Sequence, residues 1–389
     1  MRRRRPQPAD SGVVPLIDGL IARALDARAS DIHFEPTDAG VQVRLRVDGV
    51  LHETEMIPLI LLPNVVTRLK VMGGLLSYRV DIPQEGGLTL DGRPDVDARI
   101  STFPTIRGER VVVRLLPGEA NVRDLHQLGL STAVVDKLIA AAAEMQGLIV
   151  VTGPAGSGKT TTLYALLRHL RTTRPGVSLM TVEDPVELRL DGVAQIQVAP
   201  HGELTNARAL RSLLRQDPQV VLIGEIRDEE TARIALEAAL TGHLILSTMH
   251  SGYAVDAILR LLEMGLPGYQ ITSTVRLVIC QRLLRTLCGG CGGRRTVGAA
   301  GAGEEPCRTC LGCGFQGRTA VAECAEMTPD LRQAILRSAD SRELCATVSR
   351  QSSFADLAAD ARRHLKAGRT TESEVSRMVM ARHSSEARA

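Results

Sequence analysis

The chain has 389 residues, of which 44% are hydrophobic and 23% charged, and it carries a net charge of +3. This length allows two or three domains with a sizeable buried core, and the composition is that of an ordinary globular protein. The small net charge and the 2% of aromatic residues argue against a nucleic-acid partner, because they leave little for phosphate contacts or base stacking.

The amino-terminal residues give no sign of membrane insertion or export. No apolar run approaches the roughly 18 residues of a membrane span. Four arginines at 2–5 precede an apolar run at 13–21, but Asp18 interrupts that run and no small-residue cleavage site follows. We therefore expect no signal peptide, and we interpret residues 1–10 as a solvated basic tail, with contact to anionic lipid as the alternative.

Residues 11–117 are predicted to form a small α+β domain. A short amphipathic helix is followed by the alternating run 41–47, and Asp48-Gly49 behind it is a hairpin-turn signal. A second pair of strands is predicted at 96–100 and 111–116. Residues 118–128, rich in charge and poor in periodicity, are predicted to be a linker.

The core predicted at residues 129–280 alternates strands with helical stretches. Short, continuously apolar runs between helices indicate a parallel sheet covered on both faces. The predicted strands are 148–151, 179–182, 220–223 and 244–246. Residues 281–325 are rich in Gly and Cys, and residues 326–389 are predicted to form small helices, the last of which begins after 368–371.

A phosphate-binding motif directly follows the first strand of this core. Residues 153–160 fit the pattern G-x-x-x-x-G-K-[ST], whose backbone amides and helix amino terminus hold phosphate groups. Lys159 is predicted to reach the β- and γ-phosphates of ATP and Thr160 to ligate Mg²⁺. The residues predicted to bind the nucleotide are Gly153, Pro154, Ala155, Gly156, Ser157, Gly158, Lys159, Thr160 and Thr161.

Acidic residues and histidines follow the next strands. Glu183 and Glu187 come after the second strand and Glu225 after the third, where side chains of a parallel sheet face the ligand. Such carboxylates can hold the water shell of a metal or activate an attacking water, although each taken alone is as often a loop or cap residue. His243 and His250 bracket the fourth strand and are predicted to sense the nucleotide, with a structural role as the alternative.

Four segments in order resemble the boxes of the secretion ATPase family that serves type II secretion and type IV pili. Besides the phosphate loop, they are an aspartate box at 181–187, a Walker-B box at 214–228 and a histidine box at 241–250. The resemblance extends from residues 29–36 to residues 368–371. It implies a RecA-like P-loop ATPase core after a smaller PAS-like α+β domain.

The resemblance also assigns roles to individual residues. It implies that Glu187 is the general base, that Glu225 is the Walker-B carboxylate of the Mg²⁺ site, and that His243 and His250 belong to the sensor box. In this family arginines of the preceding domain approach the phosphates of the nucleotide. The candidates here are Arg99 and Arg114, with Arg227 as a weaker one.

Two C-x-x-C pairs predict a structural zinc site. Cys288 and Cys291 form one pair and Cys307 and Cys310 the other, and four thiolates at this spacing suit tetrahedral Zn²⁺. Cys313 extends the second pair, so the ligands remain open from spacing alone, whereas the resemblance favours Cys307 and Cys310. Cys280, Cys324 and Cys345 are interpreted as ordinary buried thiols.

The resemblance favours an assembly motor, because pilus retraction motors of this family lack the four cysteines. It implies a hexameric ring at the cytoplasmic face of the inner membrane, acting on a membrane platform protein. Members of the family commonly begin with a further domain that docks on a membrane partner, whereas this sequence starts almost directly at the second domain, which argues against that docking mode. The alternatives are a competence-pilus motor, a nucleic-acid translocase and a nucleotide-binding regulator that hydrolyses little.

Overall fold

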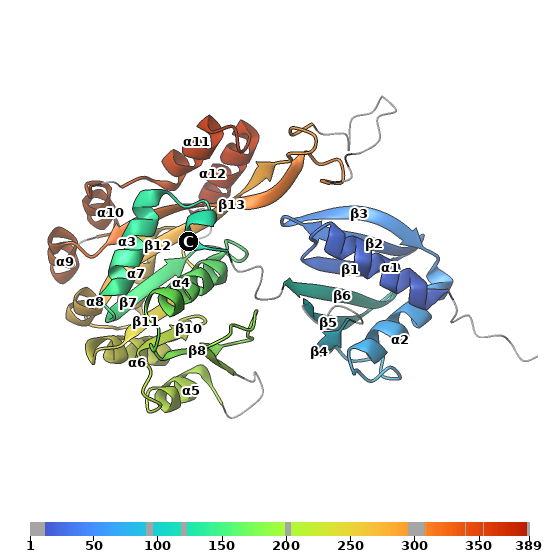
Figure 1. The fold of residues 1–389 in the computed structure, drawn as a ribbon, viewed down its shortest axis with the longest axis horizontal. Coiled ribbons are helices and arrows are strands. Elements are labelled where there is room, and N and C mark those ends of the chain that lie inside the picture. The colour runs from blue at the N-terminus through green and yellow to red at the C-terminus, as the bar shows by residue number, and fades with distance from the viewer. Residues whose placement is uncertain are drawn as a thin grey trace, which may run out of the picture. The chain divides into compact units, whose positions relative to one another are not determined.

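The computed structural model describes residues 12–90, 96–117, 123–198, 204–294, 307, 309–338, 340–352 and 354–386. The chain divides into two compact units (Figure 1). The first comprises residues 1–121 and 288–316, and the second comprises residues 122–287 and 317–389.

The first unit is built on a six-stranded antiparallel sheet of order β3-β2-β1-β6-β5-β4. The strands are β1 (Asp31–Thr37), β2 (Gly40–Val47), β3 (Val50–Ile57), β4 (Gln84–Thr89), β5 (Val96–Thr105) and β6 (Gly108–Pro117). The predicted hairpin between β2 and β3 is confirmed, and Asp48 and Gly49 both have positive φ, as its tight turn requires.

Two helices cover one face of this sheet. They are α1 (Val13–Asp26) and α2 (Leu62–Met72), the latter preceded by the short η2 (Leu59–Leu61). Their apolar residues pack on the alternate strand residues that point to the same side, such as Phe34 on β1 and Val113 on β6. The predicted α+β architecture of this region is therefore confirmed.

The second unit contains a seven-stranded sheet of order β13-β12-β7-β11-β10-β8-β9. The six strands from β12 to β9 run parallel, which confirms the predicted parallel sheet. The strands are β7 (Gly147–Thr152), β8 (Leu179–Glu183), β9 (Ala194–Gln197), β10 (Val220–Ile223), β11 (Leu244–Met249), β12 (Val275–Leu287) and β13 (Phe315–Glu326). Most of β12 and all of β13 except Glu326 lie within residues 281–325, the region that the sequence predicts to bind zinc.

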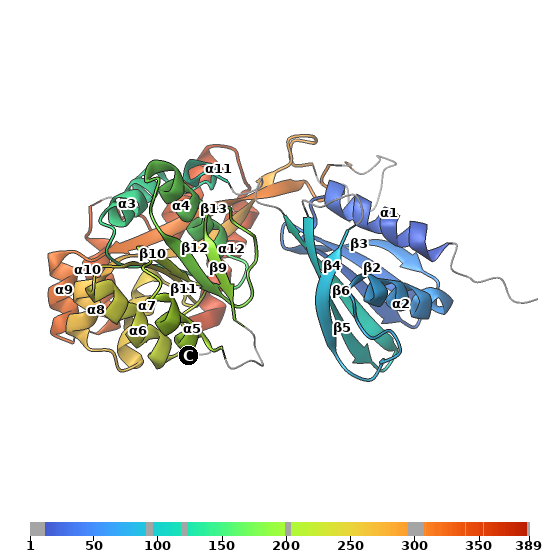
Figure 2. The ribbon, with the colours of Figure 1, turned by 60° about the horizontal axis from the view of Figure 1, so that its bottom comes forward.

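Helices lie on both faces of this sheet (Figure 2). Ile149 and Val151 of β7 pack under α3 (Thr132–Ala143) and α4 (Lys159–Thr173), while Leu148 and Val150 face the other side. The helices of that side are α5 (Asn206–Leu213), α6 (Glu229–Leu240), α7 (Ala254–Glu263), α8 (Gly268–Thr274), α9 (Pro329–Leu336), α10 (Ser341–Ser349), α11 (Leu357–Lys366) and α12 (Glu372–Glu386). Within the described ranges, no helix is long and apolar enough to cross a membrane.

Candidate active site

Four neighbouring strands deliver the phosphate loop and three further predicted residues to one edge of the second unit's sheet. Because β7, β11, β10 and β8 are parallel neighbours, their carboxyl ends lie side by side. The phosphate loop follows β7, His250 follows β11, Glu225 follows β10, and Glu183 ends β8. The structure therefore brings these segments of the chain together.

The phosphate loop has the backbone conformation that its glycines allow. Gly158, the residue before the first turn of α4, has a φ of 86°, and Gly153 has a φ of 145°. A Cβ atom at Gly153 would lie 2.5 Å from the carbonyl oxygen of Gln281, so a larger residue would displace the loop from β12. Helix α4 therefore begins at Lys159, directly after a tightly packed turn.

Lys159 points into the loop that it follows. Its Nζ atom donates hydrogen bonds to the carbonyl oxygens of Gly153 at 3.0 Å and Pro154 at 3.1 Å. Burial lowers the pKa of this ammonium group, while the negative charges of Glu225 and Glu187 act in the opposite direction. Both carboxylates thus lie within electrostatic reach of the lysine at the phosphate loop.

Two hydroxyl groups of the loop fit a phosphate and metal site. Ser157 is buried, and within the described part of the chain its Oγ atom has no hydrogen-bond partner. Thr160 occupies the second position of α4 and is half-buried, whereas Thr161 is exposed. A buried hydroxyl without a partner is costly unless a ligand supplies one, so the loop suits a phosphate-bearing ligand.

Glu225 is held between two side chains at the edge of the sheet. Its Oε2 atom accepts a hydrogen bond of 2.7 Å from Nε of Arg227, and its Oε1 atom lies 3.1 Å from Nε2 of His250. The Arg227 contact with this carboxylate raises the pKa of the guanidinium. The carboxylate predicted for the metal site is therefore oriented by one residue from its own loop and one from the next strand.

Glu183 is engaged by three donors. Its Oε1 atom accepts hydrogen bonds from Thr181 at 2.7 Å and Gln195 at 3.2 Å, and its Oε2 atom accepts one from the hydroxyl of Tyr164. Burial raises the pKa of that tyrosine, and the charge of Glu183 adds to the effect. These bonds occupy both oxygens of Glu183 and tie β8 to α4, whereas Glu187, four residues on, is exposed.

The structure does not bring His243 to this edge. It stands before the first residue of β11, at the amino end of the strand, and its carbonyl oxygen accepts a hydrogen bond from the amide of Gly147, the first residue of β7. Its Nδ1 atom lies 3.0 Å from the carbonyl oxygen of Ala238. The histidine box therefore spans the whole strand, and only His250 reaches the phosphate-loop side.

The two arginine candidates lie in the first unit. Arg99 on β5 and Arg114 on β6 are direct partners in the strand register, so their side chains share a face of the sheet. Nε of Arg114 donates a hydrogen bond of 3.0 Å to Asp31, yet its side chain stays 65% exposed. The structure thus places both arginines on one face of the first unit's sheet, whereas the phosphate loop belongs to the second unit.

Gln281 of β12 is a site residue that the sequence prediction missed. Its side chain donates a hydrogen bond of 2.8 Å to the carbonyl oxygen of Ser157 and accepts one of 2.7 Å from Thr162 of α4. The residue is only 1% exposed. The sequence signal for this residue is a glutamine directly after the apolar residues of a buried strand, because a buried amide needs a hydrogen-bond partner.

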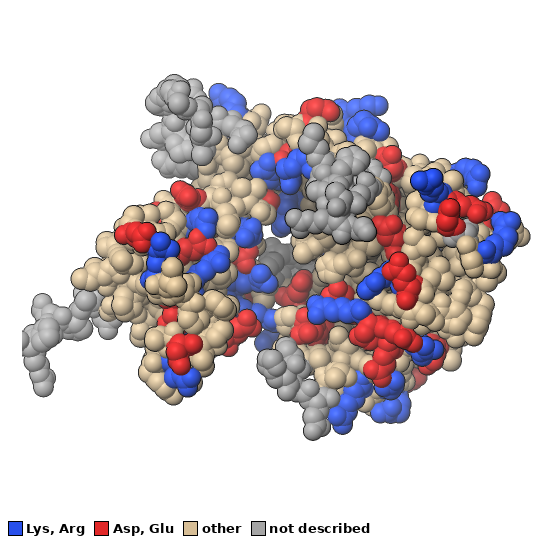
Figure 3. Space-filling view, turned by 180° about the vertical axis from the view of Figure 1, so that it is seen from behind, with Lys and Arg blue, Asp and Glu red and all other residues tan. Residues whose placement is uncertain are grey.

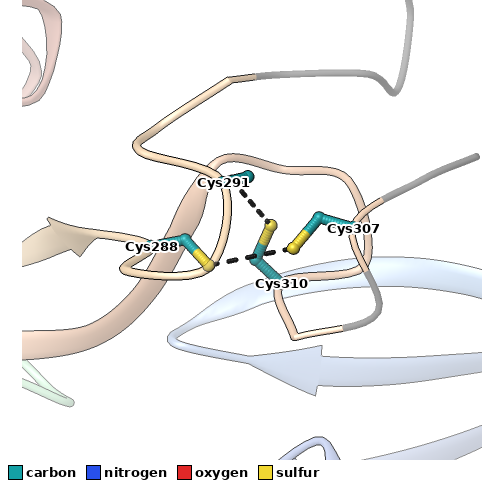
Figure 4. A group of neighbouring side chains, drawn as sticks. All are labelled: Cys288, Cys291, Cys307 and Cys310. Carbon is teal, nitrogen blue, oxygen red and sulfur yellow. Dashed lines mark hydrogen bonds between the residues drawn. The ribbon is translucent and has the colours of Figure 1, made fainter. Parts of the chain in front are cut away.

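The four predicted cysteines lie together in the first unit (Figure 4). The sulfur–sulfur distance is 4.0 Å between Cys288 and Cys307 and 3.7 Å between Cys291 and Cys310, and all four sulfurs lie within 4.8 Å of one another. Cys313 is outside this group, and its thiol donates a hydrogen bond to the carbonyl oxygen of Phe315 instead.

The remaining cysteines are dispersed. Cys280 and Cys324 are buried, as predicted, whereas Cys345 is only half-buried. Burial raises the pKa of Cys280 to about 12, which keeps this thiol protonated at neutral pH.

The family model of the type II/IV secretion system protein matches residues 7–377. The chain belongs to this family. The type II secretion system protein E of Xanthomonas campestris is 40% identical over 397 residues, covering 96% of this chain and 69% of the relative. The type IV pilus assembly ATPase PilB of Pseudomonas aeruginosa is 37% identical over 387 residues, covering 95% and 68%. The resemblance predicted from the four boxes is therefore confirmed.

Two solved structures of ATPases and motors share the fold of this chain. The ATPase DotB of Legionella pneumophila matches with a TM-score of 0.72 at 22% identity, over 97% of this chain and 98% of that one. The pilus retraction motor PilT with bound ADP matches with a TM-score of 0.65 at 24% identity, over 93% and 96%. The predicted ATPase fold is confirmed by these likenesses.

Proposed function

We propose that this protein is an ATP-hydrolysing motor that drives assembly of a type II secretion pseudopilus or a type IV pilus. The observation that carries the proposal is the phosphate loop with Lys159, Glu187 and Glu225 gathered at one edge of the sheet. The relatives named as secretion protein E and pilus assembly ATPase support the assignment of that chemistry to secretion or pilus assembly.

In the proposed reaction a water molecule attacks the γ-phosphorus of ATP, and the bond to the bridging oxygen breaks to release ADP and phosphate. Glu187 takes the proton of the attacking water. Lys159 and the loop amides stabilise the charge that develops on the γ-phosphoryl oxygens. Arg99 and Arg114 are proposed to add positive charge there, since the strand register places both residues on one face of their sheet.

The residues present fit a magnesium ion. Thr160 offers a hydroxyl at the start of α4, and Glu225 offers a carboxylate fixed by Arg227 and His250. When bound, Mg²⁺ would neutralise charge between the β- and γ-phosphates. Thr160 would be a direct ligand, and Glu225 would act through water.

The cysteine cluster fits a structural zinc ion. With Zn–S bonds of about 2.3 Å, the sulfurs of a tetrahedral site lie about 3.8 Å apart. The distances of 4.0 and 3.7 Å between knuckles match that value. Cys288, Cys291, Cys307 and Cys310 would hold the ion and close the loop between β12 and β13.

The motor is proposed to act as a ring, most simply a hexamer, at the cytoplasmic face of the inner membrane. Each cycle of hydrolysis would change the arrangement of the two units of a subunit and push on a membrane platform protein. Subunits arranged in a closed ring would deliver such strokes in sequence.

A competence-pilus motor shares the same core and stays an alternative within pilus assembly, and a nucleic-acid translocase is the second candidate function. On the face seen in Figure 3, acidic and basic side chains of the described residues are interspersed, which does not favour DNA binding on that face. The net charge of +3 agrees with that distribution.

The testing experiment is steady-state ATPase activity of the wild type and of Lys159→Ala, fractionated by size and assayed with and without DNA and phospholipid. We expect hydrolysis in a ring-sized fraction, its loss in the variant, and no response to DNA. Strong stimulation by DNA would replace the proposal by the translocase. Absence of activity in every fraction, with phospholipid present, would favour a nucleotide-binding regulator.

A further inference from the structure

The residue after Gln281 contacts the active site from another side. The Nη2 atom of Arg282 donates a hydrogen bond of 3.0 Å to the carbonyl oxygen of Gly252, in the turn that follows β11. Its Nη1 atom donates to the carbonyl oxygen of Gln281 at 3.1 Å and to the thiol sulfur of Cys280 at 3.5 Å. The guanidinium is therefore fixed between its own strand and the turn.

This guanidinium also lies against the phosphate loop. A Cβ atom added at Gly153, the first residue of the loop, would be 3.3 Å from Nη1 of Arg282. The positive charge of Arg282 is one of the influences on the pKa of Lys159, after burial and the two carboxylates. Arg282 thus contacts the turn at Gly252 through its Nη2 atom and faces the phosphate loop with its Nη1 atom.

The turn held by Arg282 is the one that carries His250. Ser251 hydrogen-bonds Thr152 at the end of β7, with 2.7 Å between their hydroxyl oxygens. The Nε2 atom of His250 lies 3.1 Å from Oε1 of Glu225, which follows the neighbouring strand β10. A continuous set of contacts therefore runs from the phosphate loop through Arg282 and the turn at 250–252 to the carboxylate of the metal site.

We propose that Arg282 is a positioning residue that couples the phosphate loop to Glu225 through the turn at residues 250–252. The inference rests on the proposed ATPase function and adds a residue that none of the four boxes contains. When phosphates fill the loop, the loop, Arg282 and the turn move as one body, and His250 sets the orientation of Glu225. Arginine suits this role because its planar fork binds several acceptors at fixed angles, which lysine cannot reproduce.

The first test compares Arg282→Ala and Arg282→Lys with Arg276→Ala. Arg276 is a matched control, because it lies on the same strand at the opposite end of the sheet and pairs with Glu144. We expect both Arg282 variants to lower kcat about 10- to 100-fold with KM changed less than about threefold, as misplacement of a catalytic group does. Unchanged kcat, or a large rise in KM alone, would overturn the inference.

The second test is a double-mutant cycle with His250→Ala. If Arg282 acts through the turn, adding Arg282→Ala to His250→Ala lowers kcat no further than about twofold. Fully multiplicative losses would overturn the inference, since they would mean that Arg282 acts independently of the turn. His243→Ala serves as the control background, because that histidine lies at the amino end of β11.

Hydrogen exchange gives a readout that does not depend on hydrolysis. A non-hydrolysable ATP analogue should protect the amides of the phosphate loop and of residues 250–253 in the wild type and in Arg276→Ala. In Arg282→Ala it should protect the loop alone. Protection of the turn in Arg282→Ala, or its absence in the wild type, would sink the inference. A wild type that binds the analogue without hydrolysing ATP would remove the proposed function while this comparison still decides the role of Arg282.

Discussion

The three glutamates at the carboxyl ends of β8 and β10, Glu183, Glu187 and Glu225, differ in what surrounds them. Glu183 is 3% exposed and accepts three hydrogen bonds. Glu225 is partly buried between Arg227 and His250. Glu187 is exposed, while its charge still acts on Lys159. Of the three, Glu187 is the exposed carboxylate whose charge acts on the lysine of the phosphate loop.

We expect Glu187→Gln to lower kcat by about 100- to 10,000-fold, because a glutamine cannot accept the proton of the attacking water. Nucleotide affinity should stay close to that of the wild type, since the amide keeps the size of the side chain. Single-turnover hydrolysis and binding of a fluorescent nucleotide measure the two quantities. Glu263→Gln, at the end of α7, is the control with an unchanged rate. Full activity in Glu187→Gln would disprove the assignment of the base.

At the residue scale, the motif residues were predictable and their supports were not. Lys159 and Glu225 stand at fixed distances from apolar runs, so a sequence pattern locates them. Gln281 and Arg282 belong to a strand more than 120 residues downstream of the loop, and only the strand order places them beside it. A pairing between strands this far apart leaves no local signal in one sequence.

At the scale of elements, α12 is fastened to the second unit by a buried carboxylate. Glu374 is 2% exposed and forms ion pairs with Arg285 of β12 and Arg377 of its own helix. Burial opposes ionisation, but the hydrogen bonds of the two arginines prevail and lower the pKa of Glu374 to about 2. The residues before the helix add a bond of 2.8 Å from Thr370 to the carbonyl oxygen of Arg285.

Replacement of this carboxylate should therefore loosen the carboxyl-terminal helix. We expect Glu374→Gln to reduce the free energy of unfolding of the second unit by about 3 kcal/mol at pH 7, because Arg285 is left without its partner. Denaturant titrations of the variant and of Glu372→Gln, an exposed neighbour on the same helix, measure the loss. Equal stability of the two variants would contradict the expectation.

The pH dependence of that contribution has a definite sign. The folded pKa of about 2 lies below the ordinary value of 4.5, so the stabilisation is fully present above pH 4.5 and is lost as the pH falls toward 2. Over this window the difference in stability between wild type and Glu374→Gln should shrink. A difference that stays constant from pH 7 to pH 3 would show that the ionised carboxylate is not its source.

The cysteine cluster should depend on its metal. We expect purified protein to contain about one zinc per chain and Cys310→Ser to lose it, because three thiolates bind Zn²⁺ far more weakly than four. Cys313→Ser, the neighbouring control outside the cluster, should keep the ion. Metal analysis of the three proteins is the measurement, and equal zinc content in Cys310→Ser and wild type would refute the ligand set.

Two of the strands that the sequence did not reveal, β12 and β9, lack a regular polar pattern. β7, β8, β10 and β11 are short apolar runs between helices, so their pattern predicts them. β12 carries polar residues at 281, 282, 285 and 286, and β9 is exposed or half-buried, so neither shows a clean period. The polar side chains of β12 contact the phosphate loop and α12, and those of β9 face partly toward solvent, so neither strand packs against one uniform core.

At the scale of the whole molecule, two units each with its own core carry the two halves of the proposed machinery. The phosphate loop and its carboxylates belong to the second unit, and the paired arginines and the cysteine cluster to the first. The order of the motifs along the chain made this division partly predictable. The return of residues 288–316 to the first unit was not, because it depends on contacts between distant segments.

If the arginines act on nucleotide within a ring, activity should depend on assembly. We expect the ATPase rate per chain to fall on dilution, in step with dissociation of the ring measured by sedimentation velocity. Lys159→Ala should assemble equally well and remain inactive, which separates assembly from catalysis. A rate per chain that is constant down to concentrations at which only monomer sediments would refute the dependence.

The phosphate loop shows how a fold sets the limits within which its own sequence can vary. A Cβ atom at Gly153 would meet the carbonyl oxygen of Gln281 at 2.5 Å, and one at Gly158 would meet the side chain of Gln281 at 2.8 Å. At Gly156 nothing lies within 4 Å, and only its φ of 73° disfavours a larger residue. Asparagine or aspartate tolerates that angle. We therefore expect the loop to accept asparagine or aspartate at Gly156, whereas β12 leaves no room for a larger residue at Gly153 or Gly158.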